Sequence, residues 1–427
     1  MEKIARRTFM KSAAIVGFPT IIPASVLGKN APSNRITLGC IGMGGQGSMN
    51  LRNFLGNEDA QVLAVCDVWE NRSKAQQNVV NKHYKGTGCK STMDCREIIA
   101  NKSIDAVVIS TPDHWHVPLS LMALEVGKDV FAEKPTLSIA EGRTLIDEVK
   151  KRKAVFQVGL EDRSVIYYHK MIEWLRNGEI GELERVDVTL PPGTIFPLEK
   201  EIPVPKGLNY ELFVGPAEYI HYCKNRTGQQ HWRNTRNFSN GKLLDWGTHL
   251  VDTAQLAVNA PGVCPVEIEA EGEIPKNSMS TVPVTYDVKY RYSNGVKVHV
   301  RSRGKSEGNA IRLTGSKGWV GNDNWCSQLK ASDQKILLTK YAAGASKHWP
   351  RPPGEQRNFL DCVKSRKLTT YTAETLHQLC TTLHAGDIAI RLGRKLKWDS
   401  MKEEFINDDA ANAMRSREAR DDWKKRG

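Results

Sequence analysis

The stretch ITLGCIGMGGQG, residues 36–47, decides how the first part of this chain folds. An apolar run is followed by glycines in the pattern GxGxxG, which predicts a strand that turns tightly into a helix. A second apolar run, VLAVC at 62–66, ends at the acidic residue Asp67, about 20 residues after the glycines. The two runs, the glycines and the acidic residue together predict a site for a dinucleotide cofactor.

Each residue of this pattern has a physical role in the predicted site. Gly42 allows the tight turn, Gly44 lets the backbone approach a pyrophosphate, and Gly47 lets helix and strand pack closely. Asp67 would accept hydrogen bonds from the adenosine ribose and repel a 2′-phosphate, which favours NAD as the cofactor. Arg72 lies close to Asp67 in sequence, so NADP stays a possible cofactor. The alternative is a glycine-rich turn without a ligand. The residues predicted here to bind the cofactor are Gly42, Met43, Gly44, Gly45, Gln46, Gly47, Asp67 and Arg72.

A chain of 427 residues is too long for one hydrophobic core, so two domains are expected. Its composition, 40% hydrophobic and 26% charged, is that of an ordinary soluble globular protein. The net charge of +13 is spread along the chain, which suits an anionic cofactor or an acidic sugar. Because neither a basic arm nor an alternation of aromatic and basic residues appears, we expect no nucleic-acid partner.

The first 30 residues are predicted to be a twin-arginine export signal rather than part of the fold. Arg6-Arg7 precedes a moderately apolar run, 12–27, that prolines interrupt. This run is too short and too broken to cross a bilayer, so we expect no membrane span and a periplasmic protein. Because the twin-arginine route moves folded proteins, the cofactor would be acquired in the cytoplasm and kept after export. The alternative is a disordered basic N-terminus.

The nine cysteines form no CxxC pair and no cysteine–histidine cluster with metal spacing, so no metal site is predicted. Cys40 and Cys66 lie within predicted core strands, where a thiol behaves as a small hydrophobic group. Cys89 and Cys95 are near enough in sequence to form a bridge, but folding in a reducing compartment argues against one.

Strand-like and helical segments alternate from residue 34 to residue 158, which predicts a doubly wound parallel sheet of the Rossmann type in an α/β domain. Ligands of such sheets bind beyond the carboxyl ends of the strands. The predicted strands are 36–41, 61–66, 105–110, 129–133 and 154–158, and the predicted helices between the later strands are 117–126 and 139–152.

Residues 159–395 are predicted to form a second domain, of the α+β class, with a largely antiparallel sheet. Asn294-Gly295 is a strong two-residue hairpin signal between the strand-like runs 284–292 and 296–303. Residues 396–427 are expected to form a polar tail. The other predicted elements are helices at 165–177, 244–258, 356–366 and 373–392 and a strand at 183–190.

Two strand ends carry residues that suit redox chemistry beside a nicotinamide. Lys134, in Glu133-Lys134-Pro135, could hydrogen-bond a reacting hydroxyl and stabilise the alkoxide that develops as hydride leaves. An ordinary surface lysine is the alternative. His114 and His116 follow another strand end, where capping and packing roles are equally open. The residues added to the predicted cofactor site are Thr111, Pro112, His116, Glu133 and Lys134.

A second group, Asp245, His249 and Asp252, lies on the predicted helix 244–258. At about 100° per residue the three fall within roughly 60° of one another, so they would share one face. His249 would take the proton of a substrate hydroxyl, and Asp245 or Asp252 would orient the ring. The alternatives are a helix cap with a surface histidine, or a metal site, for which no third ligand at suitable spacing is visible.

These residues resemble the Gfo/Idh/MocA oxidoreductases over nearly the whole chain from about residue 34. The resemblance rests on the glycine pattern with Asp67, on Thr111-Pro112 with His116, on Glu133-Lys134-Pro135, and on Asp245 and His249 at the family's Asp-x-x-x-His position. It implies two domains with the active site in the cleft between them, and Lys134, Asp245 and His249 as catalytic residues. Hydride would pass between C4 of the nicotinamide and a carbon of a sugar or cyclitol. The resemblance also implies a homodimer or homotetramer, and the leader is similar to that of an exported branch that keeps its cofactor bound.

The sequence departs from the family pattern at 159–164, GLEDRS, where relatives usually carry an amide-rich segment. Two carboxylates at this place would change the choice of substrate. Aromatic and arginine side chains before residue 244 would suit a sugar pocket. The residues predicted to contact the substrate are Asp162, Arg163, Trp232, Arg233 and Asp252.

Two rival functions stay open at this point. A redox-neutral glycoside-cleaving enzyme would oxidise one sugar carbon transiently, eliminate the aglycone and regenerate its cofactor; Lys134 argues against it, because the hydrolase branch of the family lacks that lysine. The other rival is a non-catalytic protein that binds a sugar or the cofactor.

Overall fold

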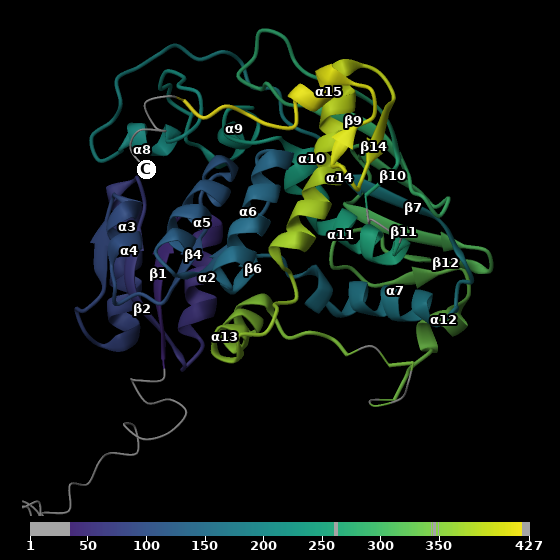
Figure 1. Ribbon diagram of the computed structural model, residues 1–427, viewed down its shortest axis with the longest axis horizontal. Coiled ribbons are helices and arrows are strands. Elements are labelled where there is room, and N and C mark those ends of the chain that lie inside the picture. The colour runs from purple at the N-terminus through teal and green to yellow at the C-terminus, as the bar shows by residue number, and fades with distance from the viewer. Residues whose placement is uncertain (1–34, 260–263, 343, 345–346, 349, 421–427) are drawn as a thin grey trace, which may run out of the picture.

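The computed structural model describes residues 35–420 except 260–263, 343, 345–346 and 349, so the predicted export signal lies outside the described residues. Two β-sheets lie along the long axis of the molecule (Figure 1). The N-terminal sheet has six strands in the order β3-β2-β1-β4-β5-β6, all parallel. This is the strand order of a dinucleotide-binding fold, so the predicted Rossmann sheet is confirmed.

The strands of this sheet are β1 (Ile36–Ile41), β2 (Ala60–Cys66), β3 (Lys90–Thr92), β4 (Ala106–Ile109), β5 (Asp129–Ala132) and β6 (Phe156–Val158). The helices that connect them are α2 (Gly45–Leu55), α3 (Glu70–Tyr84), α4 (Cys95–Ala100), α5 (His116–Glu125) and α6 (Ile139–Arg152). Strand β3 was not predicted, because its sequence, Lys-Ser-Thr, contains no apolar run.

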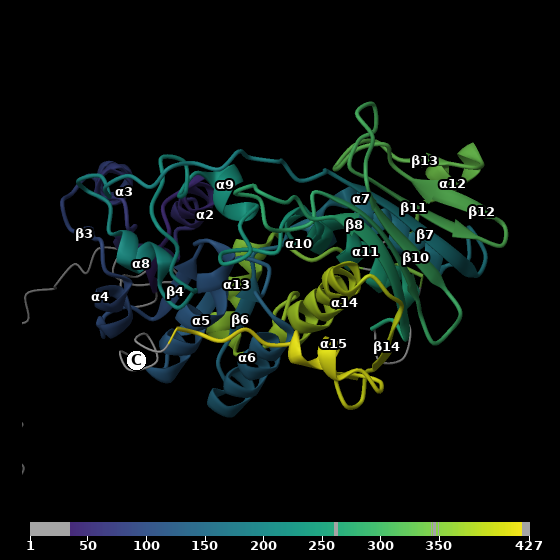
Figure 2. The same ribbon diagram turned by 90° about the horizontal axis from the view of Figure 1, so that it is seen from above.

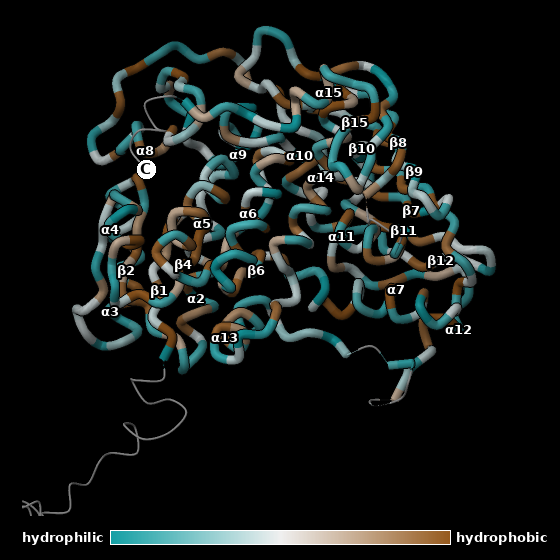
Figure 3. Tube along the Cα trace, viewed as in Figure 1, coloured by the Kyte–Doolittle hydropathy of each residue, from teal (hydrophilic) through white to brown (hydrophobic). Residues whose placement is uncertain are grey.

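Apolar strands form the centre of the Rossmann sheet. β4 and β5 are buried along their whole length, and Figure 3 shows apolar stretches along β1, β2 and β4. Such runs are typical of parallel strands covered by helices on both faces. Cys40 and Cys66 are buried in the core, as predicted. Cys89 and Cys95 are free thiols, so the bridge considered between them is absent.

The C-terminal sheet has nine strands in the order β13-β12-β11-β7-β10-β9-β8-β14-β15. Its neighbouring strands are antiparallel except for β7 and β10, which confirms the largely antiparallel sheet. The predicted hairpin joins β9 and β10, with Gly295 at a φ of +87°. The strands are β7 (Leu183–Leu190), β8 (Glu267–Glu273), β9 (Thr285–Arg291), β10 (Lys297–Ser302), β11 (Ala310–Gly315), β12 (Gly318–Gly321), β13 (Lys330–Ala331), β14 (Leu396–Asp399) and β15 (Glu404–Phe405).

Helices α11 (Gly247–Val258) and α14 (Ala373–Leu392) cover the face of this sheet that is turned toward the Rossmann domain, and α7 (Ile166–Arg176) packs against α11 (Figure 2). Across the ranges that the structure describes, no helix is both long and apolar enough to cross a bilayer. The remaining helices are α8 (Tyr210–Val214), α9 (Gln229–Arg233), α10 (Lys242–Asp245), α12 (Gln334–Leu338), α13 (Glu355–Ser365) and α15 (Asp409–Ala413).

Two C-terminal segments pack differently from the sequence prediction. Residues 396–399, expected in a polar tail, form β14, which pairs with β8 and buries Trp398. Helix α13, expected within the second domain, packs on the Rossmann domain, where Phe359 lies edge-on to Phe54 and Phe131. Both placements depend on partners far away in the sequence, which local patterns do not report.

Candidate active site

A cleft of about 820 Å³ opens at the carboxyl edge of the Rossmann sheet. The ends of β1, β2, β4, β5 and β6 form one wall, and residues of α9, α11 and the loop at Trp325 form the other. The predicted cofactor-binding residues that line the cleft are Gly42, Met43, Gly44, Gly45, Gln46, Asp67, Arg72, Thr111, Pro112, His116, Glu133 and Lys134.

The glycine-rich loop has the geometry that a pyrophosphate requires. Gly42 has a φ of +87°, which favours glycine, and a Cβ on Gly44 would meet no atom within 4 Å, so space is open there. Gly47 packs beneath the loop, where a Cβ would lie 1.7 Å from the carbonyl oxygen of Gly42. Helix α2 begins at Gly45 without a side-chain cap, and the first amide groups of such a helix attract phosphate.

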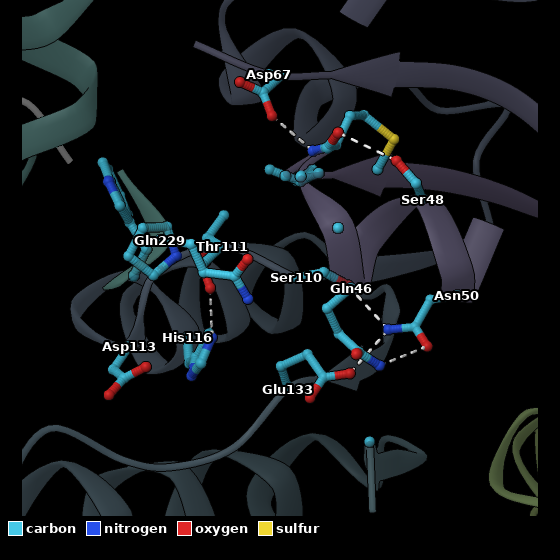
Figure 4. Close-up of a pocket in the computed structure, with 18 of the residues that line it drawn as sticks. Gln46, Ser48, Asn50, Asp67, Ser110, Thr111, Asp113, His116, Glu133 and Gln229 are labelled. Atoms are coloured by element: carbon cyan, nitrogen blue, oxygen red, sulfur yellow. Dashed lines mark hydrogen bonds between the residues drawn. The ribbon is translucent and has the colours of Figure 1, made fainter. Parts of the chain in front are cut away.

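Asp67, directly after β2, is hydrogen-bonded to the glycine-rich loop (Figure 4). One carboxylate oxygen accepts the Met43 N–H at 2.7 Å, and the other accepts the Trp69 N–H at 2.8 Å. Burial raises the pKa of Asp67, against the opposing effects of these N–H donors and of Arg72. Each oxygen keeps a free lone pair, so the carboxylate can still accept a ribose hydroxyl. The loop, the helix start and Asp67 therefore fit a dinucleotide.

Polar side chains continue from the loop to the end of β5 (Figure 4). Asn50 donates to Ser110 Oγ at 3.0 Å and to Glu133 Oε1 at 2.8 Å, which ties α2 to the ends of β4 and β5. The two ring nitrogens of His116 lie 2.8 and 2.9 Å from backbone carbonyl oxygens in the loops that follow β4 and β5. These contacts fix the backbone on which Lys134 stands.

Lys134 lines the cleft and donates to the backbone carbonyl and the carboxylate of Asp245, at 2.9 and 3.1 Å. Lys242 and Arg233 also lie against this carboxylate, at 3.0 and 3.3 Å. Burial opposes both charged forms, yet the pairing raises the pKa of Lys134 and holds the pKa of Asp245 well below its usual range. Lys134 is therefore an ammonium group with one N–H left for another acceptor.

The surroundings of His249 differ from the prediction. The segment expected to form one helix, 244–258, forms two, α10 and α11. The ring is oriented neither by Asp245 nor by Asp252: its Nδ1 lies 2.8 Å from Oδ2 of Asp162. Burial alone would lower the pKa of His249, but the charge and hydrogen bond of Asp162 outweigh burial and raise it.

Asp252 and Arg163 are engaged with each other instead. The guanidinium of Arg163 donates to both Asp252 oxygens, at 2.7 and 3.0 Å, and the hydroxyl of Tyr371 donates to Asp252 at 3.1 Å. Neither residue lines the cleft, and Asp162 is buried behind His249. Of the predicted substrate residues, Trp232 and Arg233 line the cleft.

Several cleft residues were missed by sequence reasoning. Trp246 and Trp325 pack edge-on with ring centroids 5.7 Å apart, and each lies within 5.7 Å of the His249 ring. One sequence feature indicated Glu161, because this residue lies in the segment 159–164 that departs from the family pattern. No local sequence pattern indicated the other missed residues. The missed residues that line the cleft include Glu161, Gln229, Trp246, Trp325 and Glu355.

Glu161, Asp162 and His249 bring one potential metal-binding atom each to within 4.8 Å of one another, a grouping that sequence spacing did not reveal. Each oxygen of Asp162 accepts one hydrogen bond, from His249 and from the indole N–H of Trp325, so the carboxylate holds these two side chains in place. The arrangement is that of an oriented acid–base pair.

The loop that follows Lys134 rests on a buried histidine whose protonation we expect to lower stability. His384 Nε2 lies 3.1 Å from the carbonyl oxygen of Thr136, and burial, together with nearby arginines, lowers the pKa of His384 from 6.5 to about 3. Between these two values the unfolded chain binds more protons than the folded one, so stability falls as the pH falls. From pH 7 to pH 5 the wild type should lose about 2 kcal/mol more unfolding free energy than His384→Gln. Urea unfolding at both pH values measures this difference, and equal losses would contradict it.

Comparison with known proteins agrees with this geometry. Two sequence models of one oxidoreductase family match this chain. The model of the family's NAD-binding Rossmann fold matches residues 36–160, and the model of its C-terminal alpha/beta domain matches residues 197–425. The chain belongs to the Gfo/Idh/MocA family. As a member of this family of NAD-dependent oxidoreductases, it carries an NAD-binding Rossmann domain.

The curated relatives of this Gfo/Idh/MocA protein differ in activity. Myo-inositol 2-dehydrogenase of Thermotoga maritima is 30% identical over 155 residues, 36% of this chain and 44% of that protein. Glycosyl hydrolase family 109 protein 1 of Shewanella sp. (strain MR-4) is 26% identical over 269 residues, 56% of this chain and 52% of that protein. The chain thus spans about half the length of the curated relatives it matches.

Solved structures share the fold of this Gfo/Idh/MocA protein. Aldose-aldose oxidoreductase from Caulobacter crescentus, complexed with glycerol, superposes with a TM-score of 0.62 at 20% identity, covering 85% of this chain and 99% of that one. The WlbA dehydrogenase from Bordetella pertussis, in complex with NADH and UDP-GlcNAcA, gives 0.64 at 15% identity, covering 86% and 99%. At these identities the likeness establishes the fold alone.

Proposed function

We propose that this protein transfers hydride between NAD and a secondary alcohol of a sugar or cyclitol. The observation that carries the proposal is the convergence of the Lys134–Asp245 pair and His249 on the cleft that the glycine-rich loop and Asp67 open into. Bound NAD would supply the hydride acceptor. The chain itself has to bind the alcohol, hold its oxygen and remove its proton.

The roles of the three residues follow from their contacts. Lys134 donates its remaining N–H to the substrate oxygen and stabilises the charge that develops on that oxygen. Asp245 keeps Lys134 charged and fixed in place. His249 receives the hydroxyl proton on Nε2, since Nδ1 is held by Asp162.

The cofactor is proposed to be held tightly rather than exchanged at each turnover. The segment containing α8 and α9 is fastened to the Rossmann domain beside the cleft: Trp115 Nε1 donates to the carbonyl of Leu212 at 2.9 Å, and Ser239 Oγ donates to Asp113 at 2.6 Å. Gln229 and Trp232 of the same segment line the cleft. A nucleotide bound there would be covered from both domains.

Tight binding predicts that the purified, denatured protein releases close to one equivalent of NAD(H), identified by mass spectrometry. NAD is favoured over NADP because Asp67 would repel a 2′-phosphate. Release of NADP(H) would overturn the cofactor assignment, and a protein free of nucleotide that oxidises sugars with added NAD would overturn tight binding alone.

A redox-neutral glycoside-cleaving activity is the second candidate. Its support is the similarity to a glycosyl hydrolase family 109 protein and the presence of Glu161, a further carboxylate in the cleft beside His249. Such an enzyme would release the aglycone from an aryl glycoside without net formation of NADH. The main proposal expects NADH, or reduction of a second substrate, in step with alcohol oxidation.

Export through the twin-arginine route, a periplasmic location and a homodimeric or homotetrameric assembly are further proposals from the sequence.

A further inference from the structure

We propose that Asp162 is a positioning residue of the active site: its buried carboxylate holds the His249 ring so that Nε2 meets the substrate and carries the free electron pair. The inference rests on the proposed function, in which His249 receives the hydroxyl proton. Asp162 does not line the cleft, so it acts through His249 rather than on the substrate.

The carboxylate of Asp162 is held rigidly. It stands in a 3-10 turn, Asp162–Ser164, shortly after β6, and is fully buried. Oδ2 lies 2.8 Å from His249 Nδ1, and Oδ1 accepts the indole N–H of Trp325 at 3.0 Å. The Trp325 ring also packs edge-on against His249, at 5.5 Å between centroids and 64° between planes. Imidazole and carboxylate are therefore fixed by the same tryptophan.

This contact determines the tautomer of His249. An ionised carboxylate only accepts hydrogen bonds, so Nδ1 must carry the proton and Nε2 the lone pair. When Nε2 takes a proton from the substrate, the imidazolium that forms lies against the negative charge of Asp162 and is stabilised by it. Asp162 thus favours both the starting state and the product of the proton transfer.

Other charged groups also face His249, and they do not replace Asp162. Lys134 and Glu133 approach from the end of β5, and Glu161 from the turn that holds Asp162. Lys134 lowers the pKa of His249 and Glu161 raises it, but the charge of Asp162 has the larger raising effect and Asp162 alone among these groups is hydrogen-bonded to the ring.

The competing explanation is a buried pair that serves folding alone. Asp59, far from the cleft, is such a case: it is buried and binds Arg357 at 2.8 Å, joining α13 to the Rossmann domain. Removal of a purely structural pair lowers stability without changing how His249 titrates. Asp59→Asn is therefore the matched control for Asp162→Asn.

The first measurement follows the ring directly. In ¹⁵N-histidine-labelled protein loaded with NAD, with the His249 signals assigned by their loss in His249→Ala, we expect Asp162→Asn to lower the pKa of His249 by about one to two units. The neutral ring should also shift from the Nδ1–H to the Nε2–H tautomer, because an amide can donate to Nδ1. Asp59→Asn should change neither. An unchanged His249 titration in Asp162→Asn would overturn the proposal, whether or not a substrate is known.

The second measurement uses turnover of the sugar or cyclitol that the enzyme oxidises. Asp162→Asn should lower kcat about 10²- to 10⁴-fold with little change in KM, and move the acidic limb of the kcat profile to lower pH. In a His249→Ala background the same substitution should have no further effect, because residues that act as a unit are not additive. An additive loss would contradict action through His249. Should Asp162→Asn fail to fold, Trp325→Phe, with Trp398→Phe as control, should lower kcat about tenfold, and unchanged kcat would overturn the proposal.

Discussion

Lys134→Ala is expected to lower kcat about 10²- to 10⁴-fold while the protein keeps its NAD and its fold. The variant removes a charged donor from the place where alkoxide charge develops, and no other ammonium group in the described part of the cleft replaces it. Asp245 is not left unpaired, because Lys242 and Arg233 still lie 3.0 and 3.3 Å from its carboxylate. Steady-state kinetics and the nucleotide content of the purified variant test both halves of the expectation.

Lys242→Ala is the matched control for this substitution. Lys242 binds the same carboxylate but does not line the cleft, so its loss should reduce kcat far less. His249→Ala, which removes the proton acceptor, should also lose orders of magnitude in turnover with NAD retained. A near-normal rate in either Lys134→Ala or His249→Ala would exclude that residue from the mechanism.

The sequence was most informative where structure is determined locally. The run 36–47 followed by Asp67 specifies a strand, a tight turn, a helix start and an acidic strand end within about 30 residues, so both the Rossmann sheet and its ligand edge could be predicted. Asn294-Gly295 likewise specified the hairpin between β9 and β10. Local periodicity and turn chemistry suffice for such features.

Contacts between distant residues could not be predicted in the same way. The helical pattern at 244–258 gave no sign that α10 ends at Asp245, whose backbone carbonyl accepts Lys134. Asp162, the partner of His249, lies 87 residues before it in the sequence, and Trp325, which donates to Asp162, lies 163 residues after Asp162. His249 and Asp252 do share a face of α11, but they contact different residues of one turn, Asp162 and Arg163, and Asp245 belongs to α10.

Gly47→Ala is expected to abolish NAD binding and to destabilise the protein. A Cβ at this position would lie 1.7 Å from the carbonyl oxygen and 2.9 Å from the carbonyl carbon of Gly42, so backbone would have to move against backbone. Overpacking of this kind costs about 1–3 kcal/mol or more, because α2 must move away from β1. The melting temperature of the nucleotide-free protein and its affinity for NAD should therefore both fall.

Gly44→Ala separates the two consequences. A Cβ there meets no protein atom within 4 Å, so the melting temperature of the nucleotide-free protein should stay close to that of the wild type. The same methyl group occupies the space through which a pyrophosphate would approach the backbone, so NAD affinity should fall at least about tenfold. If Gly44→Ala bound NAD normally and Gly47→Ala lost stability but not NAD binding, the glycine-rich loop would serve the packing of α2 against β1 alone. The dinucleotide would then have to lie elsewhere in the cleft. If both variants lost NAD and only Gly47→Ala lost stability, the two glycines would have the separate roles that their surroundings indicate.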